Sequence, residues 1–272
     1  MGLISKFRGK KHFKLVEEGN KYLKQDLHEE ALKCYEDALK INPKNPNVFY
    51  NIGLIYLGEE KYDDALKVYD ELVKEYPNFM EAWRIRSFIY RDTENFEEAI
   101  RSYNKILQLD PDNLEILLFK GEDLTELDRF EEALKCFDRI LELNPKEDSA
   151  WFGKGVSFRG LCRYEDSLDC FNKVVELGYE DIGVWGNKAQ LLFYLGHYIE
   201  SIKCCEKSLM FDPELLDSQS HILILLKGKS LFELKRYEDS LECFKKVLEI
   251  DPEDEDAQKY KEKIMALNND LN

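Results

Sequence analysis

The seven cysteines are the side chains of this sequence with the greatest capacity for chemistry, because a thiolate is both a nucleophile and a metal ligand. Five of them recur at gaps of 102, 34, 34 and 39 residues: Cys34, Cys136, Cys170, Cys204 and Cys243. No CxxC spacing accompanies them, and the adjacent Cys204 and Cys205 cannot point the same way on a helix. The regular spacing predicts small apolar fillers at one repeated packing site, buried and reduced, in a cytoplasmic protein.

The histidines and a short Gly-Lys-Ser run are the other residues that could hold a ligand. The histidines are scattered along the chain, with no partner at metal-ligand spacing: His12, His28, His197 and His221. Gly228 to Ser230 match only the end of a phosphate-binding loop, because Leu223 stands where that loop needs its first glycine. The acidic cluster Glu253 to Asp256 lacks the glycine and the spacing of a calcium loop. We therefore expect no catalytic group, no metal site and no cofactor, in a protein that is not an enzyme.

The composition excludes further classes of function. The chain has 272 residues, of which 44% are apolar, enough for a sizeable core, and 55 Asp and Glu outnumber 39 Lys and Arg for a net charge of −16. Such a chain repels phosphate backbones and anionic lipid, so we predict neither a nucleic-acid nor a membrane partner. The longest apolar run, Ile222 to Leu226, is too short to span a bilayer. Residues 1–11 are basic and too poor in apolar residues for a signal peptide, which favours a frayed tail or a lead-in to the first helix.

The prolines reveal the repeat that must position these side chains. They stand 34 residues apart, with Tyr179 in one proline slot and a longer gap before the last: Pro43, Pro77, Pro111, Pro145, Pro213 and Pro252. A fixed period in this range defines a structural repeat that stacks on its neighbours. The period divides the chain into seven repeats, with a five-residue insertion at Leu216 to Ser220: 12–45, 46–79, 80–113, 114–147, 148–181, 182–215 and 221–254.

Each repeat carries the same pattern of large and small side chains. Places 4, 8 and 11 hold a large, a small and a bulky residue, a spacing that puts all three on one face of a first helix. Place 20 is small and place 24 is mostly aromatic, which lets a second helix lie close against the first. In most repeats an acidic pair opens the second helix, and Asn-Pro or Asp-Pro ends it. Each repeat is therefore predicted to be a helical hairpin.

This order of large, small, aromatic, alanine, aromatic and proline positions resembles that of the tetratricopeptide repeat (TPR) family. The resemblance covers residues 12–254, and the departures lie in the C-terminal half: Tyr179 for proline, Ser167, Ser201 and Ser240 for alanine, and Cys205 for an aromatic. It implies an all-α protein, an α-solenoid whose seven hairpins form a right-handed superhelix. Residues 255–272 are predicted to form a capping helix and a tail, with Ala257, Tyr260, Ile264 and Leu267 on one stripe.

The resemblance also implies that the first helices line a concave groove, the usual seat of peptide ligands. Places 2, 5, 9 and 12 of the seven first helices give 28 groove positions, of which fourteen are apolar and seven are charged, with a sum of +1. Charge depletion with aromatic and arginine enrichment is typical of an interface core. Our candidate ligand contacts are Tyr50, Arg84, Phe88, Arg91, Phe152, Arg159, Phe193 and Lys229. The guanidinium groups of the three arginines could hold a carboxylate. Gly183 and Gly186 leave a gap for a bulky side chain.

The leading functional hypothesis is a non-enzymatic scaffold that binds a protein or peptide partner in this groove. The family members that clamp a chaperone's C-terminal carboxylate begin their signature with Lys at place 5 and Asn at place 9, whereas the first repeat here has Val16 and Asn20. The alternative is a self-assembling architectural module, with a homo-oligomer as its product. This alternative rests on the run Ile222 to Leu226, which is apolar on more than one helix face.

Overall fold

The computed structural model describes residues 2–211 and 218–269, with side chains described at 8–211 and 220–267. Within these ranges it has fifteen α-helices and no strand. The first helices of successive repeats are α1 (Gly2–Leu23), α3 (Pro46–Gly58), α5 (Met80–Asp92), α7 (Leu114–Glu126), α9 (Asp148–Gly160), α11 (Ile182–Tyr194) and α13 (Ser218–Glu233). The second helices are α2 (His28–Ile41), α4 (Tyr62–Glu75), α6 (Phe96–Leu109), α8 (Phe130–Leu143), α10 (Tyr164–Glu176), α12 (Tyr198–Leu209) and α14 (Tyr237–Ile250). A last helix, α15 (Glu255–Asn269), follows, which confirms the all-α arrangement of seven hairpins and a final helix.

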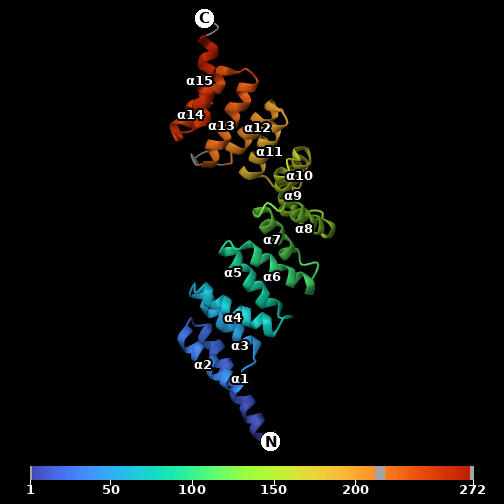
Figure 1. Cartoon of the computed structure of the whole chain (residues 1–272), viewed down its shortest axis with the longest axis vertical. Helices are drawn as coiled ribbons and strands as arrows, with labels where there is room; N and C mark the ends of the chain where they lie inside the picture. The colour runs from blue at the N-terminus through green and yellow to red at the C-terminus, as the bar shows by residue number, and fades with distance from the viewer. Residues whose placement is uncertain (1, 212–217, 270–272) are drawn as a thin grey trace. The chain divides into compact units, whose positions relative to one another are not determined.

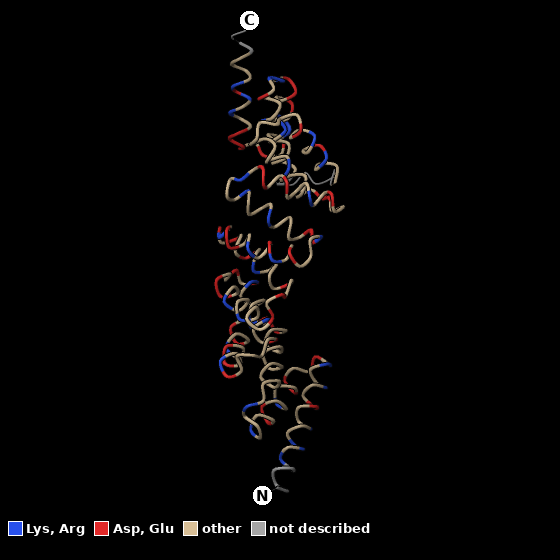
Figure 2. The backbone as a smooth tube through the Cα atoms, turned by 90° about the vertical axis from the view of Figure 1, so that its right-hand side faces the viewer, with Lys and Arg blue, Asp and Glu red and all other residues tan. Residues whose placement is uncertain are grey.

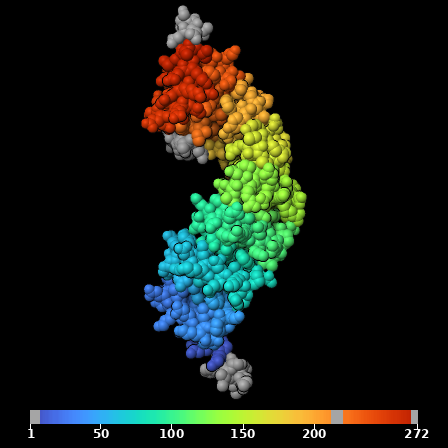
Figure 3. All heavy atoms as spheres, in the orientation of Figure 1, coloured from blue at the N-terminus to red at the C-terminus, as the bar shows by residue number. Residues whose placement is uncertain are grey.

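The chain divides into two compact parts, which we call the N-terminal unit (Met1–Asp123) and the C-terminal unit (Leu124–Asn272). In the N-terminal unit α1 packs against α2, α3 against α4 and α5 against α6. In the C-terminal unit the same pairing joins α9 to α10, α11 to α12 and α13 to α14. Neighbouring hairpins pack through α2 and α3 and through α4 and α5 in the N-terminal unit, and through α10 and α11 and through α12 and α13 in the C-terminal unit, so that within each unit these segments lie side by side (Figures 1 and 3). The contacts of a hairpin are therefore made within its own repeat and with the repeats next to it.

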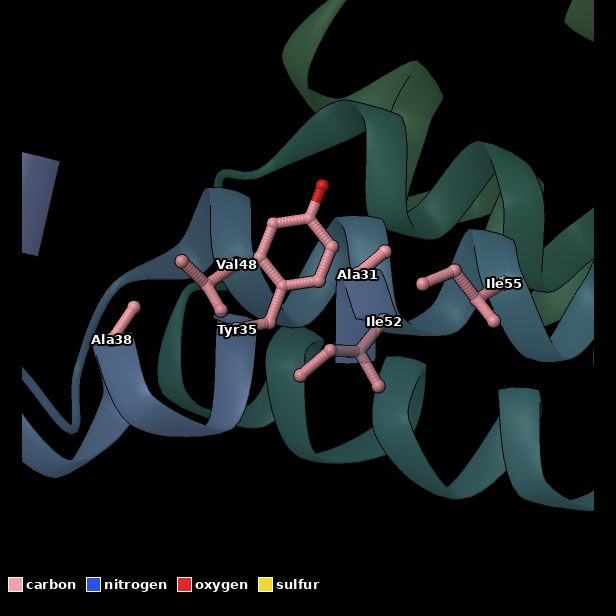
Figure 4. Packing of buried hydrophobic residues seen from close by; sticks show 6 residues of the cluster. All are labelled: Ala31, Tyr35, Ala38, Val48, Ile52 and Ile55. Carbon is pink, nitrogen blue, oxygen red and sulfur yellow. The ribbon is translucent and has the colours of Figure 1, made fainter. Parts of the chain in front are cut away.

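The core of the first hairpin shows how a repeat buries its apolar residues. Tyr35 and Ala31 of α2 are fully buried and pack with Val48 and Ile52 of α3, so the first two repeats share one core. Figure 4 shows the ring of Tyr35 among these side chains. The hydroxyl of Tyr35 donates to Asn20 Oδ1 at 2.7 Å, which satisfies the polar end of an otherwise apolar side chain.

The small residue at place 8 and the aromatic residue at place 24 fit one another directly. A Cβ atom built on Gly53 would lie 2.6 Å from Cζ of Tyr69, and one built on Gly155 would lie 2.9 Å from Cε2 of Phe171. Tyr69 and Phe171 are both fully buried and have no room to retreat. In these two repeats glycine fits place 8 because a methyl group there would overlap the ring, whereas the third repeat has the buried Ser87 at place 8 with Tyr103 at place 24.

The sixth repeat keeps this packing with a different pair of residues. Ala189 replaces the glycine and Cys205 replaces the ring, and both side chains are fully buried. The larger residue at place 8 is thus matched by a smaller one at place 24. The serines that replace alanine at place 20 form a hydrogen bond instead. The hydroxyls of Ser167, Ser201 and Ser240 each donate to the backbone oxygen of the place 8 residue in the same repeat, at 2.6, 2.8 and 2.8 Å.

Every hairpin turn contains one residue in the left-handed region, at place 15. Six of the seven are not glycine, with φ between 54° and 60°: Asp26, Glu60, Glu94, Asp128, Cys162 and Lys235. Gly196 is the seventh, with φ of 78°. A side chain in this region costs about 1 kcal/mol or more relative to glycine, so the turns hold backbone strain that the packing of the hairpins outweighs.

The helices begin and end where the sequence predicts, except at the turn before Tyr179 and at the start of α13. The acidic pairs lie in the first turns of α2, α4, α6 and α8, where they favour the positive end of the helix dipole. The missing proline at Tyr179 is replaced by a Schellman turn, in which Gly178 has φ of 91° and Tyr179 N donates to Val174 O at 3.2 Å. The described part of the insertion, 218–220, extends the start of α13, whereas 216–217 and Pro213 lie outside the described residues.

The first and the last of the residues described at either end of the chain, from Gly2 and up to Asn269, are helical. The basic segment for which the sequence left a tail or a lead-in open continues α1 back to Gly2, because nothing in it breaks a helix. Its Arg8, Lys10 and Lys11 are exposed, and Figure 2 shows basic positions along this helix. At the other end, Ala257 and Ile264 of α15 are fully buried and Tyr260 stacks on Phe244 with ring centroids 5.3 Å apart. Leu267, predicted on the same stripe, is 38% exposed.

Candidate functional site

In the N-terminal unit the groove arginines are already paired with carboxylates. Arg84 donates to Glu115, and Arg91 Nη2 donates to Glu122 Oε2 at 2.5 Å. Both glutamates stand 31 residues after their arginines, on the first helix of the next repeat. These two guanidinium groups, predicted to hold a ligand carboxylate, therefore have internal partners instead.

Arg91 also faces a buried acid that the sequence analysis did not single out. Asp123 is 1% exposed, and its Oδ1 lies 3.3 Å from Arg91 Nε. Burial lowers the pKa of Arg91, but the hydrogen bond to Glu122 and the charges of Asp123 and Glu122 outweigh it and raise that pKa overall. The guanidinium also lies over Phe119, 4.5 Å from the ring centroid. Arg91 is thus built into the packing of the N-terminal unit.

The predicted aromatic contacts of this unit pack against other rings. Tyr50 meets Tyr69 and Phe79 edge-on, with centroids 6.1 and 5.8 Å apart. Phe88 meets Phe119 edge-on at 5.5 Å. Both are only partly buried, so each has a packed side and a side that remains open to solvent.

In the C-terminal unit, three of the predicted residues line one cavity of about 480 Å³. Arg159 comes from α9, Phe193 from α11 and Lys229 from α13. The other lining residues are mostly apolar or amide-bearing: Ile182, Gly183, Gly186, Asn187, Gln190, Tyr194, Ile222, Leu223, Leu225 and Leu226. Predominantly apolar walls with a few polar groups are typical of a ligand site.

Arg159 is held in this cavity by neutral amides. Its Nη1 donates to Asn187 Oδ1 at 2.6 Å and to Gln190 Oε1 at 3.0 Å. Asn187 is fixed in turn by donating to Gly183 O at 2.9 Å, and Gln190 Nε2 lies 3.4 Å from the hydroxyl of Tyr194. No carboxylate of the described residues forms an ion pair with Arg159. The guanidinium is therefore held in one orientation by neutral groups, and no carboxylate in the described part of the chain compensates its positive charge.

The two glycines of α11 form the gap that the sequence predicted. A Cβ atom on Gly186 would find only Leu223 Cδ2 at 3.6 Å and Ser208 Oγ at 3.8 Å, which are ordinary contacts. One on Gly183 would meet its neighbour Asp181 at 3.3 Å. Unlike Gly53 and Gly155, Gly186 is not required by packing, and it lines the cavity.

Two of the predicted residues of this unit, Lys229 and Phe152, have partners outside the cavity. Lys229 Nζ donates to Asp256 Oδ2 at 2.5 Å, and this bond, together with the lysine charge, lowers the pKa of the Asp256 carboxyl. Phe152 packs edge-on against Phe171 with centroids 5.3 Å apart and is not among the cavity-lining residues. The structure thus brings together Arg159, Phe193 and Lys229, of which Lys229 has its charge compensated.

Family models described as a TPR repeat or a tetratricopeptide repeat match residues 19–59, 50–114, 90–153, 182–215 and 225–254. The chain belongs to the tetratricopeptide repeat family. No curated protein matches it. None of the TPR helices described here combines the length and the apolarity needed to cross a bilayer.

Several solved structures share this TPR fold. A tetratricopeptide repeat protein from Parabacteroides merdae ATCC 43184 is 22% identical, with 94% of this chain and 99% of that one covered and a TM-score of 0.60. PilW, a type IV pilus biogenesis factor, is 20% identical, with 79% and 97% covered and a TM-score of 0.62. MamA is 18% identical, with 64% and 92% covered and a TM-score of 0.57. At these identities the likeness shows the fold alone.

One group of potential metal ligands does come together in the seventh TPR repeat, contrary to the expectation that the histidines have no such partner. His221, Asp251 and Asp254 bring one ligand-type atom each within 4.8 Å of one another. His221 Nε2 lies 2.8 Å from Asp254 Oδ2, while Asp254 Oδ1 caps α15 by accepting from Ala257 N. The first repeat has the same arrangement with an amide, since Asn45 Nδ2 lies 2.8 Å from His12 Nε2. In both cases the hydrogen bond joins the first residue of a repeat to the last residue of the same repeat.

The cysteines of the TPR core are free and mostly buried, as their spacing predicted: Cys136, Cys170, Cys204, Cys205 and Cys243 are buried, Cys34 is half-buried and Cys162 is exposed. Burial raises the pKa of both Cys170 and Cys205 to about 12, with smaller contributions from neighbouring charges. These thiols stay protonated at neutral pH and are poor nucleophiles.

Proposed function

We propose that this TPR protein is a non-enzymatic scaffold and that its C-terminal unit binds a peptide segment in the cavity between α9, α11 and α13. The large apolar side chain of such a segment would enter the gap at Gly183 and Gly186. Ile222, 58% exposed at the cavity wall, and the half-buried Phe193 offer it contact area.

The observation that carries this proposal is the open space beside Gly186. Glycine inside a helix is less stable than alanine by about 1 kcal/mol, and nothing near Gly186 would obstruct a methyl group. A position where the chain gives up stability without a packing reason favours a functional explanation. The groove arginines of the N-terminal unit, Arg84 and Arg91, are ion-paired and so offer a ligand no uncompensated charge.

The proposal is tested by filling the cavity. Peptides would first be selected on the immobilised full chain from a phage-displayed library of random 12-residue sequences. The dissociation constant of the best synthetic peptide would then be measured by fluorescence anisotropy against the wild type and Gly186→Leu. The leucine occupies the space of the ligand side chain, so we expect binding to weaken by about 10-fold or more, the worth of burying one large apolar side chain.

Gly9→Leu is the matched control, because a Cβ atom on Gly9 of α1 would meet nothing within 4 Å, and Gly9 does not line the cavity. It should bind the peptide as the wild type does. Far-UV circular dichroism would verify that both variants are folded. Equal affinity for Gly186→Leu and the wild type, or a library that yields no binding sequence, would contradict the proposal.

The feature that motivated self-assembly has a role within the C-terminal unit. Leu223 and Leu226 pack with Ala189 and Cys205, while Ile224 and Leu225 pack with Phe244 and the start of the α15 core. Only Ile222 of the run is exposed, and it lines the cavity. The run is apolar on both faces of α13 because the hairpin α11–α12 packs on one side and α14 with α15 on the other. We place the scaffold in the cytoplasm, where its free thiols would stay reduced.

A further inference from the structure

Arg91 and Arg159 stand at the same place in their repeats but face different partners. Each is at place 12, and each donates to the residue 31 positions later, at place 9 of the next repeat. That residue is Glu122 for Arg91 and Gln190 for Arg159. The glutamate neutralises its arginine, whereas the glutamine holds the same geometry and leaves the charge in place.

We propose that the cavity of the C-terminal unit selects a peptide that carries an Asp or Glu side chain close to its large apolar side chain, and that Arg159 pairs with this carboxylate. The inference depends on the proposed function and specifies its ligand. A guanidinium that amides already hold in place loses little conformational freedom when it donates hydrogen bonds to a carboxylate. Lys229 cannot compete for it, because Asp256 already holds that ammonium group.

The carboxylate belongs to a side chain and not to a chain end. The amides that hold Arg159 lie in the middle of α11, at Asn187 and Gln190. Cavity-lining residues continue from them in both directions along this helix, to Ile182 and Gly183 on one side and to Phe193 and Tyr194 on the other. A peptide that ended at Arg159 would leave one of these sides uncovered, whereas one that passes through covers both.

The test uses the selected peptide in an acetylated and amidated form, together with a copy in which its acidic residue is replaced by the matching amide. On the wild type we expect the amide copy to bind about 10-fold more weakly or worse, because a hydrogen bond between charged groups is lost. On Arg159→Gln the two peptides should bind equally. On Gln190→Glu, which neutralises Arg159 as Glu122 neutralises Arg91, the preference for the acidic peptide should also disappear.

Arg84→Gln is the control, since Arg84 lies in the N-terminal unit and already pairs with Glu115; this variant should keep the full preference. The inference is overturned if the selected peptides lack acidic residues or if the amide copy binds the wild type equally well. It is also overturned if amidation of the C-terminus abolishes binding, because a terminal carboxylate is then the group recognised. If Gly186→Leu still weakens binding in those cases, peptide binding in the cavity is supported and only the recognition of an acidic side chain by Arg159 is refuted. If Gly186→Leu has no effect, both proposals are refuted.

Discussion

A pair of glycine-to-alanine substitutions tests whether the two kinds of glycine in the first helices have different origins. Gly53→Ala places a methyl group 2.6 Å from the fully buried ring of Tyr69. Overpacking of this kind costs about 3 kcal/mol at its upper range, while the better helix propensity of alanine returns about 1 kcal/mol. We expect a net loss of about 2 kcal/mol. Gly186→Ala gains the same propensity and meets its nearest atoms at 3.6 and 3.8 Å, so we expect a gain of about 1 kcal/mol.

The two substitutions lie in different units, so each needs a local measurement as well as a global one. Urea unfolding followed by far-UV circular dichroism would report the global change. Hydrogen exchange read by mass spectrometry on fragments from α3–α4 and α11–α12 would report the stability of each hairpin, which in a repeat protein can change independently. The reasoning is refuted if Gly53→Ala is as stable as the wild type, or if Gly186→Ala is less stable than it.

Three further predictions concern the turns, the serines and the thiols. Lys235→Gly should stabilise the protein by about 1 kcal/mol, because φ is 60° at this place; an unchanged melting temperature would contradict this. Ser201→Ala should destabilise it by about 1 kcal/mol in urea unfolding, through loss of the buried bond to Ala189 O; equal stability would show that this bond contributes nothing. At pH 8 a thiol reagent should titrate exposed Cys162 quickly and Cys205 only on unfolding. Because the pKa of Cys205 is near 9 when unfolded and about 12 when folded, the unfolded state loses its proton first. Stability should therefore fall between pH 9 and pH 12, and a flat profile would contradict the assignment.

The fold could be predicted from the sequence because packing in a repeat protein has the same period as the sequence. A glycine at place 8 and a ring at place 24 recur together, so the contact between Gly53 and Tyr69 is visible as a pattern. The exchange to Ala189 and Cys205 looked like a departure, yet the two changes compensate. The left-handed residue at place 15 was missed, because six of its seven occupants are not glycine and share no chemical property.

The candidate site was predictable only in part, because charge pairing depends on residues in the next repeat. The sequence offered Arg84, Arg91 and Arg159 as equivalent cations, and only the structure shows which of them are neutralised. A signal was present nevertheless: place 12 contacts place 9 of the next repeat, an offset of 31 residues. Reading that offset along the sequence would have separated Arg91, which faces a glutamate, from Arg159, which faces a glutamine.

Several departures from the repeat pattern lie in α11 or in the segments next to it, and this placement has a physical reason. A solenoid gains stability from repeats that pack alike, so a position that breaks the pattern loses energy unless it is compensated or used. Around α11, the substitutions at Ala189 and Cys205 compensate one another, and the Schellman turn at Gly178 replaces a proline. Gly186 and the uncompensated charge of Arg159 have no such explanation in the packing. They are the two features that a ligand with an apolar and an acidic side chain would complete.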